Sequence, residues 1–60
     1  MTLRIKIGGS LITDIEQWDG VIPCVGDTLV LYRLGMRAEF QVVKRVIDTL
    51  SPNIVIVDVK

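Results

Sequence analysis

Residues 27–47 read DTLVLYRLGMRAEFQVVKRVI, a pattern of two β-strands joined by a short turn. The first strand is rich in β-branched and aromatic residues, and the connection Leu34-Gly35-Met36 contains a glycine that is free to take positive φ. In the second strand, from Arg37 to Ile47, apolar and polar residues alternate until Val42-Val43, where the alternation breaks. We expect a β-bulge near Val42-Val43, because one extra residue would restore the register.

The two ends of the chain continue this β pattern. Residues 2–8 alternate apolar with polar side chains and predict a half-buried strand. Residues 54–59 read IVIVDV and are apolar on both faces, so this strand needs cover on both sides. A barrel interior would supply one side, and a partner subunit could supply the other.

Residues 10–20 have two interpretations. Leu11, Ile15 and Trp18 recur at helical spacing, and Ser10 is a suitable helix cap. However, the segment begins with β-prone residues and the chain is β-rich elsewhere. We therefore favour a strand over residues 11–17.

Five strands, at about residues 2–8, 11–17, 27–33, 37–47 and 54–59, predict one all-β domain over residues 1–60. We expect a small antiparallel five-stranded barrel or sandwich. The pattern Pro23-x-x-Gly26-Asp27 leading into a strand, then a glycine hairpin and a long strand, resembles SH3-like small barrels, a type common among short phage and mobile-element proteins. That resemblance implies a binding role and identifies no functional residue.

Length and composition favour self-association. A 60-residue chain is marginally stable alone, and Cys24, the only cysteine, cannot form an internal disulfide. Half of the residues are hydrophobic, which predicts exposed apolar surface and a homodimer or higher symmetric oligomer; the alternative is a monomer with scattered surface valines. The expected interface is the last strand, with residues Ile54, Val55, Ile56, Val57 and Val59.

Charge and cysteine content constrain partners and location. The net charge is zero, so general attraction to nucleic acid or to an anionic membrane is not implied. No apolar run approaches the length of a membrane span. A lone cysteine is typical of a reducing compartment, and we expect a cytoplasmic protein.

Catalytic chemistry is not expected. The chain has no histidine, which excludes Ser-His-Asp and Cys-His sites, and we expect Cys24 to be a buried apolar residue. Asp14, Glu16 and Asp19 form an acidic cluster whose spacing matches no calcium loop, so a solvated face is the expectation. We predict no enzyme activity, no metal and no cofactor.

Two groups of residues are candidates for binding. Tyr32, Arg33 and Arg37 flank the hairpin turn and could grip a phosphate or a stacked base; the alternative is an ordinary charged hairpin. Trp18 is either a lid on the core or an interface anchor. Residues 11–27 carry four acidic and no basic residues, whereas residues 28–47 are net basic. These segments either steer association or neutralise each other across the sheet.

Three functions remain open from the sequence. The first is a non-catalytic protein-binding or inhibitory module. The second is a module that binds a nucleotide, a small anion or a nucleic-acid strand through Tyr32, Arg33 and Arg37. The third is a structural accessory subunit of a larger particle.

Overall fold

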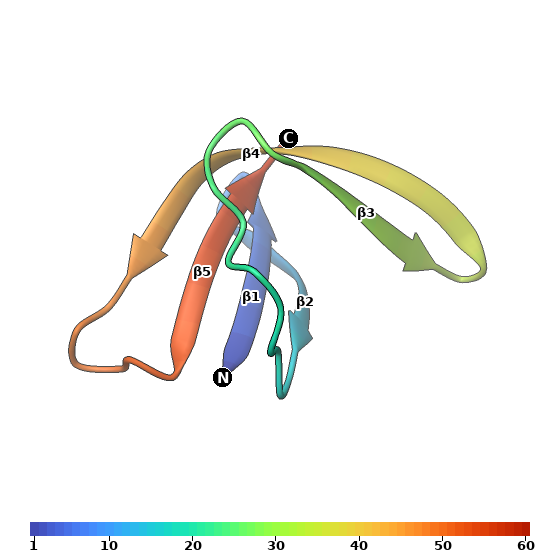
Figure 1. Cartoon of the computed structure of the whole chain (residues 1–60). Helices are drawn as coiled ribbons and strands as arrows, with labels where there is room; N and C mark the ends of the chain where they lie inside the picture. Colours follow the sequence, from blue (N-terminus) through green and yellow to red (C-terminus); the bar gives the residue numbers. More distant parts are fainter.

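The computed structural model describes all residues, 1–60, and contains five β-strands and no helix. The strands are β1 (Thr2–Ile7), β2 (Ser10–Ile15), β3 (Thr28–Arg33), β4 (Met36–Ile47) and β5 (Ile54–Val59). They form one sheet in the order β2-β1-β5-β4-β3, which curls into a half-barrel (Figure 1). The predicted all-β class is confirmed, and so is a strand rather than a helix after Ser10.

The sheet is mixed, and this corrects the predicted antiparallel arrangement. β5 pairs with β1 in parallel, while the other three neighbouring pairs are antiparallel. Alternation along a strand indicates which face is buried but not the direction of the neighbouring strand. The sequence pattern therefore could not distinguish parallel from antiparallel pairing. β2 and β3 are the two edges of the sheet and are not hydrogen-bonded to each other.

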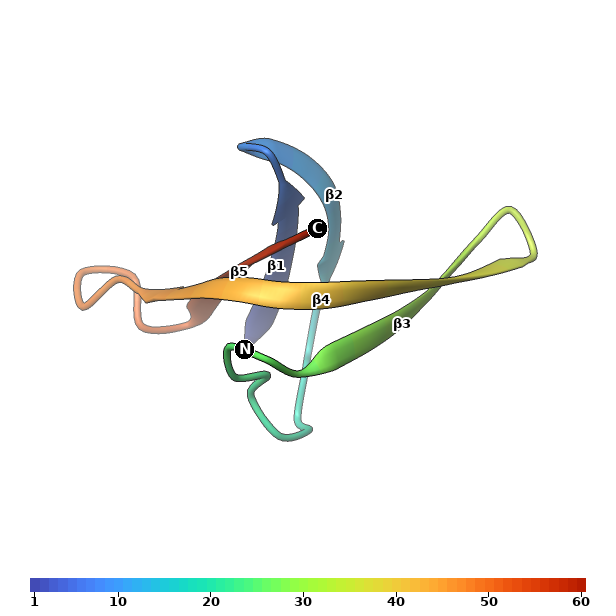
Figure 2. The same ribbon diagram turned by 90° about the horizontal axis from the view of Figure 1, so that it is seen from above.

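β4 joins two parts of the sheet. Its first half pairs with β3 and its second half with β5, and the register shifts between Val42 and Lys44. Val43 is therefore the extra residue of a bulge, as predicted. The part of β4 that precedes the bulge forms a hairpin with β3, and Figure 2 shows the end of this hairpin projecting past the other strands. The longest dimension is 34 Å, against 22 and 21 Å for the other two.

The core lies on the concave face of the half-barrel. Its seven buried apolar residues are Leu3, Ile5, Leu31, Val42, Val55, Val57 and Val59. The parallel register of β1 and β5 places Leu3 opposite Val55 and Ile5 opposite Val57, so the two central strands supply most of the core. Burial of these side chains is the main driving force for folding.

The connection between β2 and β3, residues 16–27, covers part of that concave face. Trp18 and Ile22 are half-buried there and pack against the core. Cys24 is exposed, which corrects the prediction of a buried cysteine. Its Sγ accepts a hydrogen bond from Nη1 of Arg45, at 3.4 Å.

The surface is large for the chain length. The accessible area is 4307 Å², whereas a folded monomer of this mass has roughly 3,900 Å². Only eight of the 60 residues are buried. The projecting hairpin accounts for this shape, because it adds much surface and β3 contributes only one buried side chain, Leu31, to the core. With no helix in the structure, there is none of the length and hydrophobicity that a membrane-spanning helix requires.

Candidate functional site

The end of the β3–β4 hairpin is the most exposed apolar part of the sheet. We define the hairpin tip as residues 32–37, all six of which are exposed. Tyr32 and Met36 are 72% and 73% accessible, and Leu34 is fully so. Tyr32 lies opposite Arg37 and Met36 lies opposite Arg33, so the tip exposes one large apolar side chain on each face of the hairpin and Leu34 at its end.

The turn at the tip uses an unfavourable residue. Leu34 and Gly35 both have positive φ, at 52° and 77°, which is the pattern of a two-residue type I′ turn. Such turns favour Asn-Gly or Gly-Gly, since an L-residue with a bulky side chain loses roughly 1–2 kcal/mol in the left-handed region. Leu34 combines that conformational cost with the cost of exposing a whole leucine side chain to water. Neither cost has a compensating contact within the chain.

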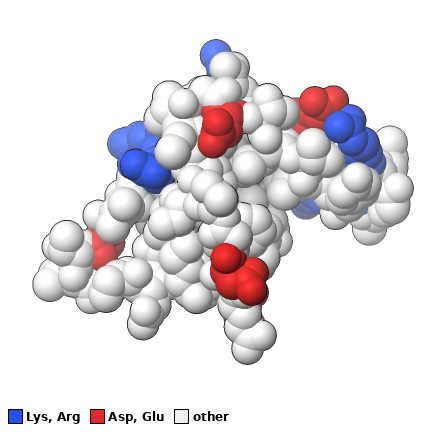
Figure 3. Space-filling model, viewed as in Figure 1, with Lys and Arg blue, Asp and Glu red and all other residues white.

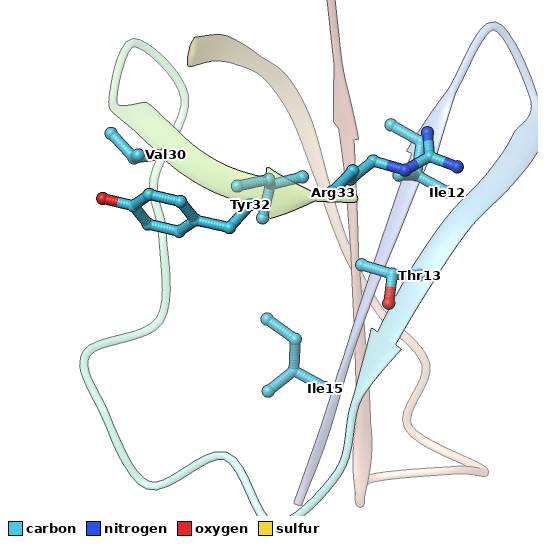
Figure 4. A pocket seen from close by; sticks show the side chains of 7 residues that line it. Ile12, Thr13, Ile15, Val30, Tyr32 and Arg33 are labelled. Carbon is cyan, nitrogen blue, oxygen red and sulfur yellow. The ribbon is translucent and has the colours of Figure 1, made fainter. Parts of the chain in front are cut away.

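The predicted trio of Tyr32, Arg33 and Arg37 does not assemble into one site. Tyr32 lies opposite Arg37 across the hairpin, so these two share a face, whereas Arg33 lies opposite Met36 on the other face. Figure 4 shows the Arg33 side chain extending toward Ile12 while Tyr32 extends away from it. Arg37 is also engaged already, because its Nη1 donates to Oε2 of Glu39 at 2.8 Å.

An apolar cavity lies in the gap between the two sheet edges, and we call this gap the open seam. The cavity has a volume of about 380 Å³ and five of its seven lining residues are hydrophobic. β2 contributes Ile12, Thr13 and Ile15, and β3 contributes Val30 to Arg33 (Figure 4). Curling of the sheet brings these edges toward each other without joining them, and no acidic side chain lines the cavity.

The last strand lies at the centre of the sheet rather than on an outer face. Val55, Val57 and Val59 belong to the core and are covered by the same chain. Of the residues expected at an oligomer interface, only Ile54 and Ile56 keep accessible surface, and both are half-buried. Trp18 lies over the core, and its buried Nε1 has no hydrogen-bond partner.

Charged groups are dispersed, and the two oppositely charged segments do not neutralise each other. Asp14 binds Arg4 of β1 through two hydrogen bonds, of 3.0 and 3.2 Å. The hydrogen bond from Arg4 lowers the pKa of the Asp14 carboxyl and raises that of the guanidinium. Neither of the two ion pairs of the chain, Arg4–Asp14 and Arg37–Glu39, joins the acidic segment to the basic one. Figure 3 shows small separate groups of charge on a mostly uncharged face.

The hairpin tip and the open seam both present apolar side chains. No group of three or more metal-ligating side chains is present. Comparison of the chain with protein-family models, with curated proteins and with solved structures finds no match. The hairpin tip and the open seam are therefore interpreted from their own geometry.

Sequence reasoning missed Leu34 and Met36 as site residues and missed the seam entirely. A local signal for Leu34 was present, because leucine stands where a two-residue hairpin turn favours asparagine or glycine. The seam had no local signal, since it depends on which strands end up at the edges.

Proposed function

We propose that this chain is a non-catalytic protein-binding module that docks its partner on the hairpin tip. The observation that carries the proposal is Leu34, an apolar side chain that is fully exposed and held at positive φ. A strained, solvent-exposed leucine with no structural role points to selection for contact with something outside the chain. Such a module acts by occupying a surface of its partner.

The surroundings of Leu34 support this assignment. Tyr32 and Arg37 lie side by side on one face of the hairpin, and both residue types are enriched at the centres of protein interfaces. Met36 lies on the other face of the hairpin, opposite Arg33, and adds a flexible apolar side chain beside Leu34. The nucleotide or anion alternative has weaker support, because Arg33 lies on the opposite face and Arg37 is bound to Glu39.

The test is capture of proteins from a lysate of the source cell by the immobilised chain, with two matched variants. Leu34→Asp removes the proposed anchor, and Leu50→Asp makes the same change at another highly exposed leucine, in the β4–β5 turn. We expect a partner that wild type and Leu50→Asp retain and that Leu34→Asp loses by at least about tenfold, since a buried leucine contributes roughly 1.5–3 kcal/mol. Retention of every captured protein by Leu34→Asp would contradict the proposal.

A further inference from the structure

We infer that the free edge of β3 pairs with the same edge of a second copy, antiparallel and with Val30 opposite the partner's Val30. The resulting homodimer has a two-fold axis through that pair of valines. The paired edge shares Tyr32 and Arg33 with the hairpin tip, but the proposed anchor Leu34 lies outside the pairing, so either proposal can fail without the other. It follows from four features of β3.

The first feature is the set of unpaired backbone groups. Arg33 and Met36 flank a two-residue turn and therefore form a hydrogen-bonded pair with each other. Hydrogen-bonded pairs alternate along an antiparallel ladder, and the bond from Val42 N–H to the Asp27 carbonyl (2.9 Å) continues the series. The N–H and C=O groups of Thr28, Val30 and Tyr32 consequently point away from β4, toward the free edge.

The second feature is the absence of edge protection. Exposed edges are normally blunted by charge, proline or a bulge. β3 has no proline, no bulge against β4, and no charged residue before Arg33. β4 is its only neighbouring strand. The chain has 32 backbone hydrogen bonds, whereas a closed domain of this length has roughly 40.

The third feature is a register that satisfies both hydrogen bonding and charge. With Val30 opposite the partner's Val30, Thr28 lies opposite the partner's Tyr32. The free N–H and C=O groups of all three residues on each strand then have hydrogen-bond partners on the other strand. The same register places Asp27 opposite the partner's Arg33, twice by symmetry. A shift by two residues loses one hydrogen-bonded pair and separates these opposite charges.

The fourth feature is the apolar surface beside the edge. Val30 is 38% accessible, and Leu29 is half-buried. In the dimer Leu29 lies next to the partner's Leu31 on the face that lines the open seam. The pairing extends that apolar face from one half-barrel to the other and leaves the two hairpin tips pointing in opposite directions.

The first experiment measures the mass of the purified chain by light scattering and sedimentation, at micromolar to millimolar concentration. We expect twice the chain mass of 6.7 kDa. Val30→Pro removes an N–H that β4 does not use, and proline is tolerated at such edge positions, so this variant should fold as a monomer. Circular dichroism checks the fold.

The second experiment is a charge swap that tests the register. Arg33→Glu alone and Asp27→Lys alone each place like charges opposite one another and should weaken dimerisation by at least about tenfold. An equimolar mixture restores both opposite-charge pairs, and it should form a heterodimer of near wild-type stability. Lys44→Glu, at an exposed residue of β4 that has no ion-pair partner and does not pair with β3, is the matched control and should leave the mass unchanged. The thermal midpoint of each variant is measured as well, because Asp27 also accepts a hydrogen bond from Cys24 N.

A wild-type chain that stays monomeric at millimolar concentration overturns the inference. So does a dimer that survives both Val30→Pro and Arg33→Glu, since its interface would lie elsewhere. A dimer that Val30→Pro dissociates, with a heterodimer from the charge-swapped mixture, supports the pairing and its register. If Val30→Pro fails to fold, the charge swap decides alone.

Discussion

The two hairpins of this protein share a turn geometry but differ in their edges and surroundings. β1–β2 and β3–β4 both turn through two residues of positive φ, Gly8-Gly9 in the first and Leu34-Gly35 in the second. The first hairpin lies within the body of the sheet, and its turn residues are suited to the conformation. The second projects beyond the core and holds a leucine where the backbone favours another residue. The first turn has residues that tolerate its backbone conformation, and the second has a residue that stability does not explain.

The free edges of the two hairpins also differ, because one is protected against pairing and the other is not. At the β2 edge the register with β1 shifts, which leaves Ile12 as the extra residue of a bulge, and Asp14 is fixed by two hydrogen bonds to Arg4. A bulge and a charge are both devices that prevent pairing with another strand. β3 has neither, and its sequence before Arg33 is uncharged. One edge of the half-barrel is therefore blocked, and the other is open to pairing.

The largest difference in stability should be between a substitution at a buried residue of β3 and one at an exposed residue of β2. Leu31→Ala removes the only buried side chain of β3 and should lower the free energy of unfolding by about 2–3 kcal/mol. Leu11→Ala, at a residue that is 57% accessible on β2, should cost less than about 0.5 kcal/mol. Urea unfolding at one fixed protein concentration measures both. Equal values would mean that the hairpin does not contribute to the core.

Substitutions in the two hairpin turns should change stability by smaller amounts, and with opposite signs. Leu34→Asn places a residue that tolerates positive φ in the second turn and should raise stability by about 1 kcal/mol. Gly8→Leu introduces the unfavourable residue into the first turn and should lower stability by a similar amount. Thermal unfolding of both variants measures the difference.

The same Leu34→Asn variant should lose affinity for a partner that docks on the hairpin tip. Gain of stability with loss of binding is the expected signature of a residue kept for function. If Leu34→Asn leaves stability unchanged, Leu34 is not strained, and the main argument for the tip fails.

Much of the fold could be predicted because strand alternation is a local property. The strand boundaries at residues 54–59 agree with the structure, and the break at Val42-Val43 correctly indicated the bulge. The parallel pairing of β1 with β5 could not be predicted, since it depends on contacts between the two ends of the chain. The exposure of Cys24 was missed for a related reason, as it depends on how residues 16–27 cross the concave face.

The candidate site was harder to predict from the sequence than the fold. Tyr32 and Arg37 were correctly placed near each other because a two-residue turn fixes the register of the hairpin. Arg33 was grouped with them by proximity in the chain, although adjacent residues in a strand point to opposite faces. The apolar character of residues 54–59 suggested an external interface, but the core residues of the same curled sheet cover one apolar face of this strand.

The smallest change in thermal stability should come from removing the Arg4–Asp14 ion pair at the β2 edge. Hydrogen bonding from Arg4 lowers the pKa of Asp14, so the folded chain binds the Asp14 proton less tightly than the unfolded chain does. The stabilisation is therefore fully present above the unfolded pKa, about 3.9, and is lost as the pH falls through the lowered pKa. Because the pair is solvent-exposed, Asp14→Asn should reduce the thermal midpoint only slightly at neutral pH, and the difference should disappear in acid.

The Asp14→Asn variant also tests which device blocks the β2 edge. Asp19→Asn, at an exposed carboxylate without an ion-pair partner, is the control and should leave the thermal midpoint unchanged. The mass of Asp14→Asn should equal that of the wild type, because the bulge at Ile12 still disrupts the ladder that a second strand would need. Additional association of Asp14→Asn would show that the charge, rather than the bulge, keeps this edge unpaired. The contrast between the two edges would then rest on one ion pair.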